Sequence, residues 1–513
     1  MDLTFEILTI LAIGMGLYHY FLRGMSYFKE KEVPHVSPIP IFGNIAPYIF
    51  RRKAIQILLQ EMYCKFSNAK YFGFFDFTTP VIVIRDPELI NSITIKNFNN
   101  FCDHTSFFQE HETIMARNLF QLKGDTWREM RKILSPTFTS SKMKMMFGLI
   151  EECVGNFINH VAAKSEDGWT VEMKDIFVRY TNDAVASTAF GISIDSMKNP
   201  NNDFITQVTK TLNFDSIVSL KLVAGKNFPR LFKILDIKLF TEKVCSFFRQ
   251  VIIDTIETRE RESIIRPDMI QLMMESREKS QMSYDDMTAQ AFLFFLAGSD
   301  STAVFMCFLA HELAVNTEIQ RKLREEIDQV LQQTNGQPTY DAIMNMKYMD
   351  AIVNETLRLY PLSAFADRYC VKSFELPPPT PEGKPLTVTP GSTLWFLPYS
   401  LHRDPKYFPD PEKFDPNRFL DDNNIDPMTY IPFGSLPKER PTFFRLSYKI
   451  QSKLHNSAVL GFFMLYRNVF ACISETTLQR LRFVDYFRTA RINIRGLYKR
   501  CHSSLWSLSI DTF

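Results

Sequence analysis

The residues best suited to chemistry interrupt an apolar stretch in the middle of the chain. In Phe292-Leu-Phe-Phe-Leu-Ala-Gly-Ser-Asp-Ser-Thr-Ala303, Gly298 and the polar run Ser299 to Thr302 follow hydrophobic residues. Glycine lets a flat ligand approach the backbone closely, and serine or threonine hydroxyls can bond to carbonyls of the preceding turn and open a helix locally. The pattern predicts a helix with a groove for a ligand at this point.

An acid lies beside two hydroxyls in this run. Asp300 precedes Ser301 and Thr302, so the three side chains could pass protons to a buried reaction. The alternative is a helix that ends here. Because the apolar pattern resumes from Phe305 to Leu313, we favour the groove.

Two further sets of charged residues stand out. Glu355 and Arg358 are three apart in Ala351-Ile-Val-Asn-Glu-Thr-Leu-Arg-Leu-Tyr360, and Arg418 follows in Phe414-Asp-Pro-Asn-Arg-Phe419. Alone, such a pair is ordinarily a surface ion pair worth about 0.3–0.5 kcal/mol. A carboxylate shared by two guanidiniums among apolar residues indicates instead a buried network that is costly to break.

Trp127 and Arg131 lie four apart in Gly124-Asp-Thr-Trp-Arg-Glu-Met-Arg-Lys132 and would share a helix face. The arginine supplies a fork of donors and the tryptophan one N–H, so the pair could bind an anion such as a carboxylate. The alternative is an ordinary solvated helix face.

The elements that must position these residues are mostly helical. Amphipathic stretches dominate from Leu119 to Leu359, and Ile319 to Leu331 shows one apolar and one charged face. Short β-prone runs, such as Val81 to Arg85 and Thr393 to Leu397, lie toward the ends. We predict a mainly α fold with a minor β sheet.

Composition excludes several classes of protein. Hydrophobic residues make up 45% and charged residues 23% of the 513 residues, with 47 Phe against 18 Gly, which excludes a disordered or low-complexity chain. The net charge of +2 argues against nucleic-acid binding. No glycine-rich phosphate loop follows a strand pattern, so no nucleotide site is expected.

The amino terminus predicts a membrane anchor. Leu3 to Leu22 is mostly apolar and about as long as the ~20 residues that span a bilayer. A cleaved signal peptide is the alternative, but the acidic start and the lack of a small-x-small site favour an anchor. Basic residues follow, which places the body in the cytosol. We expect an anchor at residues 1–23, a basic, Pro-rich linker at 24–45 and a domain at 46–435.

The cysteines show no Cys-x-x-Cys pair and no zinc-type spacing. Scattered cysteines in a long chain are typically reduced and buried, which suits a cytosol-facing protein. The eight are Cys64, Cys102, Cys153, Cys245, Cys307, Cys370, Cys472 and Cys501.

Taken in order, these motifs resemble those of the cytochromes P450, in particular the microsomal insect detoxification type. Trp127 with Arg131, Ala297 to Thr302, Glu355 to Arg358 and Pro416 to Phe419 are similar to that family's signatures in helix C, helix I, helix K and the following loop. The resemblance runs from the anchor to about Ser435. It implies a P450-like fold, as one large domain behind the anchor.

The resemblance also implies roles for particular residues. Haem propionates would be bound by Trp127, Arg131 and Arg368, with Gly298 also contacting the cofactor. The core would be locked by Glu355, Arg358 and Arg418. Protons for dioxygen activation would be guided by Asp300 with Ser301 or Thr302. The family usually has threonine where Ser301 stands, a mild change because the hydroxyl is kept.

The sequence departs from the family where the iron ligand is expected. The family's loop is Phe-x-x-Gly-x-x-x-Cys-x-Gly, and aligning Phe433 places Leu436 at the first glycine, Arg440 at the cysteine and Thr442 at the last glycine. A guanidinium is permanently protonated and has no acceptor lone pair, so it cannot replace a thiolate that donates electrons to iron. We therefore identify no metal ligand.

The chain beyond Ser435 departs from the family altogether. Residues 436–513 carry 13 Lys and Arg against 4 Asp and Glu, an aberrant basic tail in place of the ligand region. Neither Cys370 nor Cys472 has a glycine-flanked loop, so rescue by another thiol is not expected. The coincidence suggests a frame change, a retained intron or a misassembled gene.

The resemblance implies a haem-thiolate monooxygenase of small lipophilic compounds in the endoplasmic reticulum membrane. Electrons from NADPH would come through a separate NADPH–cytochrome P450 reductase. With Arg440 at the ligand position we expect impaired activity. The alternative is a catalytically inactive, haem-deficient, membrane-anchored P450-like protein. Candidates for an apolar substrate pocket, or else ordinary core residues, are Phe98, Phe101, Phe107, Phe108 and Phe365.

Overall fold

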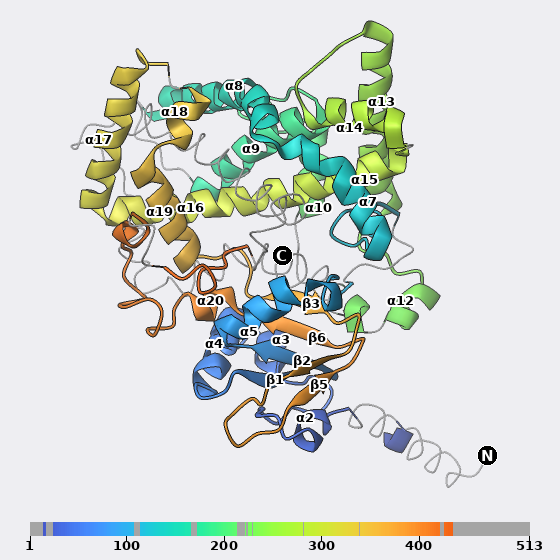
Figure 1. Cartoon of the computed structure of the whole chain (residues 1–513). Coiled ribbons are helices and arrows are strands. Elements are labelled where there is room, and N and C mark those ends of the chain that lie inside the picture. Colours follow the sequence, from blue (N-terminus) through green and yellow to red (C-terminus); the bar gives the residue numbers. More distant parts are fainter. Residues whose placement is uncertain are drawn as a thin grey trace. The chain divides into compact units, whose positions relative to one another are not determined.

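A computed structural model shows a chain that is mainly helical with small mixed sheets, as the sequence predicts (Figure 1). The structure describes residues 14–16, 24–106, 113–165, 172–212, 221, 224–227, 229–280, 282–337, 339–420 and 425–433. Two compact units divide the chain. The first unit is formed by residues 1–105, 363–411 and 426–437, and the second by 106–362, 412–425 and 438–513.

The first unit is built on a four-stranded sheet of order β1-β2-β6-β3. The strands are β1 (Tyr71–Asp76), β2 (Thr79–Ile84), β3 (Ala366–Tyr369) and β6 (Thr393–Phe396). β1 pairs antiparallel with β2, β2 pairs parallel with β6, and β6 pairs antiparallel with β3. The two β-prone runs expected from sequence are therefore neighbours, β2 and β6. A separate antiparallel pair joins β4 (Phe374–Leu376) and β5 (Leu386–Val388).

Short helices complete the first unit. They are α2 (Tyr27–Glu30), α3 (Ala46–Ile49), α4 (Ile55–Lys65), α5 (Pro87–Asn91), η1 (Ser92–Lys96), η2 (Phe98–Asn100) and α20 (Pro398–Leu401). Every residue of β1 is buried, and Gly73 in its middle lets the ring of Phe28 lie against the backbone. A Cβ at position 73 would lie 2.4 Å from that ring, so only glycine fits.

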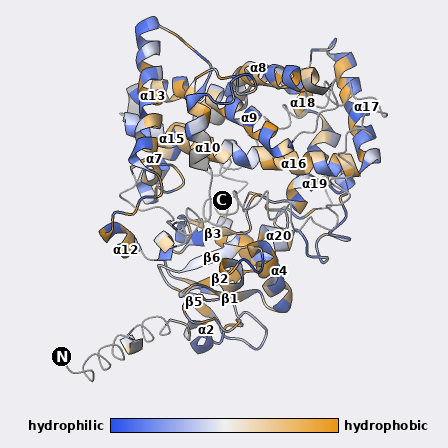
Figure 2. Cartoon of the chain, turned by 180° about the vertical axis from the view of Figure 1, so that it is seen from behind, coloured by the Kyte–Doolittle hydropathy of each residue, from blue (hydrophilic) through white to orange (hydrophobic). Residues whose placement is uncertain are grey.

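The second unit is helical. Its elements are α6 (Thr113–Ala116), α7 (Gly124–Leu134), η3 (Ser135–Phe138), α8 (Ser140–Ser165), α9 (Met173–Val185), η4 (Ala186–Phe190), α10 (Asp203–Leu212), α12 (Pro229–Ile234), α13 (Glu242–Glu262), α14 (Met269–Ser280), α15 (Tyr284–Gly298), α16 (Asp300–Val315), α17 (Thr317–Gln333), α18 (Tyr340–Met344), α19 (Lys347–Leu359) and η5 (Pro416–Phe419). Figure 2 shows both hydrophilic and hydrophobic residues along α17, as its amphipathic pattern predicts, and Leu323 and Ile327 are its buried residues.

The centre of this unit is the apolar stretch Tyr284–Val315, formed by α15 and α16. Within the described residues it alone is long and apolar enough to cross a membrane, but 83% of its most apolar window is buried inside the protein. It is therefore a core element rather than a span. The predicted anchor at residues 1–23 lies outside the described residues, apart from positions 14–16.

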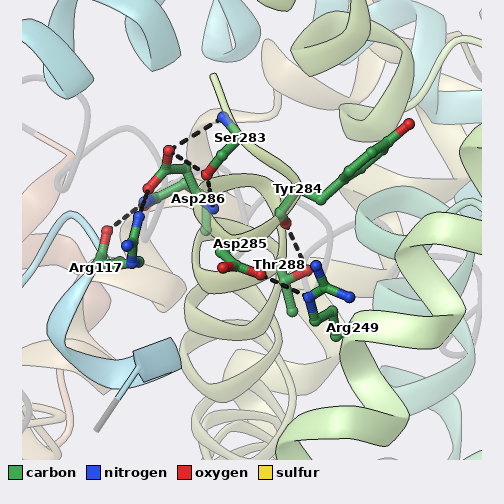
Figure 3. A network of polar contacts seen from close by, with 8 residues as sticks. Arg117, Arg249, Ser283, Tyr284, Asp285, Asp286 and Thr288 are labelled. Carbon is green, nitrogen blue, oxygen red and sulfur yellow. Dashed lines mark hydrogen bonds and ion pairs between the residues drawn. The ribbon is translucent and has the colours of Figure 1, made fainter. Parts of the chain in front are cut away.

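A capping box starts α15 (Figure 3). The Ser283 hydroxyl oxygen accepts from the Asp286 N–H at 3.1 Å, and the Asp286 carboxylate accepts from the Ser283 N–H at 3.1 Å. Arg117 donates to Asp286 at 3.1 Å, and Arg249 donates to Asp285 at 2.6 Å. These contacts satisfy donors that a helix start leaves free and place acids at its positive end, which fixes where the central helix begins.

Ser283→Ala is expected to lower the free energy of unfolding by about 0.5–2 kcal/mol, because the Asp286 N–H loses its acceptor. Urea unfolding of the full chain measures the loss. Ser283→Asn keeps a capping oxygen and is the matched control. Equal losses in both variants would contradict the capping role.

Candidate active site

Glu355, on the buried face of α19, is a charged group with several partners. Arg358 donates to it through Nε at 2.7 Å and through Nη2 at 2.9 Å, a two-bond contact one turn along the helix. Both residues are fully buried. Arg418 in η5 brings its Nε to 3.6 Å from the same carboxylate, which also accepts from the Asp415 N–H at 2.8 Å.

This network joins two distant stretches of sequence. Arg358 also donates to the Lys413 carbonyl at 3.2 Å, so one guanidinium ties α19 to the segment before η5. The Glu355 carboxylate therefore helps to join α19 to the segment before η5, although many residues separate the two in the sequence. The surface-pair alternative for Glu355 and Arg358 does not apply, since neither side chain reaches solvent.

The groove expected around Gly298 corresponds to a break in the central helix. α15 ends at Gly298, Ser299 has φ −80° and ψ −80°, and α16 begins at Asp300. The Ser301 hydroxyl donates to the Ala297 carbonyl, the back-bond expected to open a helix. Because α16 continues to Val315, the helix is interrupted rather than ended.

The acid at this break is buried. Asp300 is 5% exposed, and its Oδ2 has no hydrogen-bond partner within the described part of the chain. The Thr302 hydroxyl, 4% exposed overall, likewise has none there. Burial raises the pKa of the Asp300 carboxyl, and Lys174 on α9 acts in the opposite direction. A buried carboxyl with a raised pKa beside hydroxyls is suited to exchanging protons.

Trp127 and Arg131 both lie on α7, as predicted. Arg131 is 2% exposed, which excludes the solvated-face alternative for it, and Trp127 packs against the main apolar cluster of the second unit. Within the described residues, Arg131 Nε and Nη2 have no acceptor. Burial lowers the pKa of this guanidinium to about 9. Such a group suits an anionic ligand, because an unpaired buried cation is costly.

Arg368 lies on β3, in the first unit. It is 4% exposed, donates from Nη1 to the Asp367 carbonyl at 2.7 Å, and lies 3.5 Å from His104 Nε2. Asp367 accepts from the Thr105 N–H at 2.7 Å and contacts His104 Nδ1 at 2.8 Å. Burial acts to raise the pKa of Asp367, but His104 and Thr105 outweigh it and hold that pKa at about 2.

The structure thus brings together the Glu355 group and, separately, the residues of the helix break. Arg440, which the sequence leads us to expect at the iron-ligand position, lies outside the described residues, as do Cys472, Phe107 and Phe108. Of the pocket candidates, Phe101 is fully buried in a core cluster and Phe365 stacks on Trp395, which favours the core alternative for both. Sequence reasoning missed Lys174, Asn182 and His104, since no motif marks them.

Comparison with known proteins decides the family. The family model for cytochrome P450 matches residues 33–435. The chain is a cytochrome P450. It is 41% identical to "Cytochrome P450 9e2" of Blattella germanica, covering 84% of this chain and 86% of that protein. It is 37% identical to "Probable cytochrome P450 9f2" of Drosophila melanogaster (84% and 87%) and 35% identical to "Cytochrome P450 3A11" of Mus musculus (85% and 86%).

Membership of the P450 family makes the protein a monooxygenase by family and sets haem as the expected cofactor. The buried Arg131 guanidinium fits a carboxylate-bearing cofactor, because it offers two nitrogens without acceptors in the described chain. Among the described cysteines, burial raises the pKa of Cys64, Cys153 and Cys370, to about 12 for Cys153.

Glu355→Gln is expected to lower the free energy of unfolding by about 3–5 kcal/mol, because the fully buried Arg358 and the partly buried Arg418 lose their countercharge. Chemical denaturation of the full chain measures the change. Glu318→Gln breaks an exposed i,i+3 pair with Arg321 and should change stability little. Similar effects in the two variants would contradict the network's importance.

Arg131→Met is expected to raise the free energy of unfolding of the haem-free P450 by about 1–4 kcal/mol, because it removes a buried charge without acceptors while keeping the apolar stem. Arg128→Met, at an exposed position on the same helix, is the control. Urea unfolding compares them, and a loss of stability confined to Arg131→Met would show that the protein itself satisfies this guanidinium.

Proposed function

We propose that residues 46–435 form the scaffold of a haem-thiolate monooxygenase of small lipophilic compounds, and that the chain as printed has impaired activity. The observation that carries the first part is the family match over residues 33–435. The observation that carries the second is the sequence Leu436-Pro-Lys-Glu-Arg440, which has arginine where the family's pattern has the cysteine ligand.

The scaffold's own residues would serve as follows. Trp127, Arg131 and Arg368 would bind the haem propionates, which is supported by the burial of both guanidiniums and by the open donors of Arg131. Gly298, at the end of α15, would let the ring approach the backbone. Haem with a thiolate ligand supplies dioxygen activation in this family.

Proton transfer would depend on the helix break. Asp300 is buried, its pKa is raised, and one of its oxygens lacks a partner in the described chain. Ser301 bonds back to Ala297, which keeps the helix open beside the acid. Thr302 would add a second hydroxyl, which is buried without a hydrogen-bond partner in the described chain. Burial excludes bulk water, so protons would pass through these side chains rather than through free solvent.

The missing ligand limits what this chain can do. The family match ends at residue 435, the position after which the motif pattern fails and the charge changes sign. No step can be assigned to an iron centre held by Arg440. Neither Cys370 nor Cys472 has a glycine-flanked loop, which argues against rescue by either thiol. We therefore propose that the native carboxy-terminal segment has been replaced, by a frame change, a retained intron or gene misassembly.

A second candidate is a catalytically inactive, haem-deficient, membrane-anchored P450-like protein. The basic tail favours this candidate, because residues 436–513 replace the expected ligand region and carry 13 Lys and Arg against 4 Asp and Glu. Without a cofactor that binds only the folded state, such a protein also loses the stabilisation that binding supplies. Sequencing the transcript across the Ser435 codon separates the two: an intact frame without an alternative exon favours the inactive protein.

Localisation and electron supply follow the same proposal. An anchor at residues 1–23 and a basic, Pro-rich linker at 24–45 would hold the domain on the cytosolic face of the endoplasmic reticulum. A separate NADPH–cytochrome P450 reductase would supply electrons, which agrees with the lack of a glycine-rich nucleotide loop in the sequence.

Replacing residues 436–513 with the corresponding segment of the Blattella germanica relative is expected to restore NADPH-dependent oxidation of a lipophilic alkoxycoumarin in vesicles with reductase. The expected reason is that the graft returns the thiolate to an intact scaffold. The matched control is the same graft with its loop cysteine changed to arginine. A folded graft that binds haem without turnover would contradict a competent scaffold in residues 46–435.

A further inference from the structure

Helix α9 contacts both residues at the break of the central helix. The Asn182 side-chain oxygen accepts from the Ser299 hydroxyl, and Lys174 Nζ lies 3.7 Å from Asp300 Oδ1. The two residues at the break are themselves buried: Ser299 is 0% and Asp300 is 5% exposed. α9 and α16 pack along each other, so one helix holds two consecutive residues of the other.

The two contacts differ in kind. Asn182 is 1% exposed and makes a direct hydrogen bond, which fixes the backbone at the break. The Lys174 side chain is 22% exposed, and its 3.7 Å separation is longer than a charge-assisted hydrogen bond. Lys174 therefore acts on the buried carboxylate through its charge, from a side chain that reaches the solvent side of α9.

Several other charged groups on the elements packed against α16 have partners of their own. They are Arg179 with Asp175 and Asp183 with the Ser196 N–H on α9, Asp285 and Asp286 with Arg249 and Arg117 on α15, Glu318 with Arg321 and Glu326 with the Tyr348 and Met349 N–H groups on α17, and Glu355 with Arg358 and Arg418 on α19. On α16 itself, Glu312 accepts from Tyr360 and Asn316, and burial lowers the pKa of His311. Of the described charged groups, Lys174 is the one whose charge lowers the pKa of Asp300.

We propose that Lys174 is a positioning residue whose charge opposes protonation of the buried Asp300 carboxyl group and draws its Oδ1 toward α9. Oδ2 then remains available on the other side of the carboxyl group, without a partner in the described chain. The Asn182–Ser299 bond holds the break in place while the lysine sets the charge. The inference deepens the proposed function, because it names the group that controls the acid at the helix break.

The charge of Asp300 has a direct spectroscopic readout. In Lys174→Met the carboxylate loses its cation while burial remains, so Asp300 should take up a proton at neutral pH. Infrared spectroscopy of the full chain should then show a protonated-carboxyl band that is absent from the parent. The double variant Lys174→Met with Asp300→Asn should lack the band, and Lys174→Arg should match the parent. The control Lys322→Met, on the exposed face of α17, should also match it.

Stability against pH provides a second measurement. Since the folded-state pKa of Asp300 is raised, the folded protein holds this proton more tightly than the unfolded chain, and the group destabilises the fold as pH rises above its ordinary value. Removing Lys174 raises the folded pKa further. The denaturant midpoint of Lys174→Met should therefore fall below the parent's increasingly as pH rises, and the difference should disappear in the Asp300→Asn background.

Three results would overturn the proposal: no new carboxyl band in Lys174→Met, a band that persists in the double variant, or a band of equal size already present in the parent and lost in Asp300→Asn. A pH-independent loss of stability would mean that Lys174 has only a packing role. Neither measurement needs haem or reductase. A failed graft experiment therefore leaves this inference standing, and a failure here leaves the proposed monooxygenase scaffold standing.

Discussion

The described helical unit depends on a buried carboxylate, that of Glu355, compensated by two guanidiniums. A charge taken out of water is stable only if its countercharges and hydrogen bonds are in place, and here Arg358, Arg418 and the Asp415 N–H supply them. Because these groups come from α19 and from the segment around η5, the network is complete only when both segments are in place.

Two other buried charged groups have fewer hydrogen-bond partners. Arg131 has two nitrogens without acceptors in the described chain, and Asp300 has one oxygen without a donor. In a stable core such groups would be costly, so they mark places where the protein is arranged for a partner or a reaction rather than for packing. Arg131 suits an anion, whereas Asp300 at a helix break suits proton exchange. Each residue belongs to the second unit, and each lies in a motif that the family resemblance had singled out.

Much of this could be predicted from the sequence, for physical reasons. The 3.6-residue periodicity of α17 predicted a helix, and the β-prone runs of β2 and β6 predicted strands. The polar run after Gly298 indicated a local opening of the helix, and the structure has a break there. Burial of Glu355 and Arg358 could not be inferred from their spacing alone, because the same spacing occurs in the exposed pair Glu318–Arg321. Lys174 had no signal at all, since its contact with Asp300 arises only from the packing of α9 on α16.

The chain belongs to the cytochrome P450 family, and our central proposal is that its reactive centre is impaired. Dioxygen activation in this family needs an anionic sulfur on iron, and the motif pattern of the sequence leads us to expect the cation Arg440 at that position. The most direct measurement is the carbon monoxide difference spectrum of the reduced, purified chain with the printed sequence, supplied with haem. The account predicts no thiolate-type Soret band. Such a band would contradict it, because sulfur would then be bound to iron despite the loss of the loop.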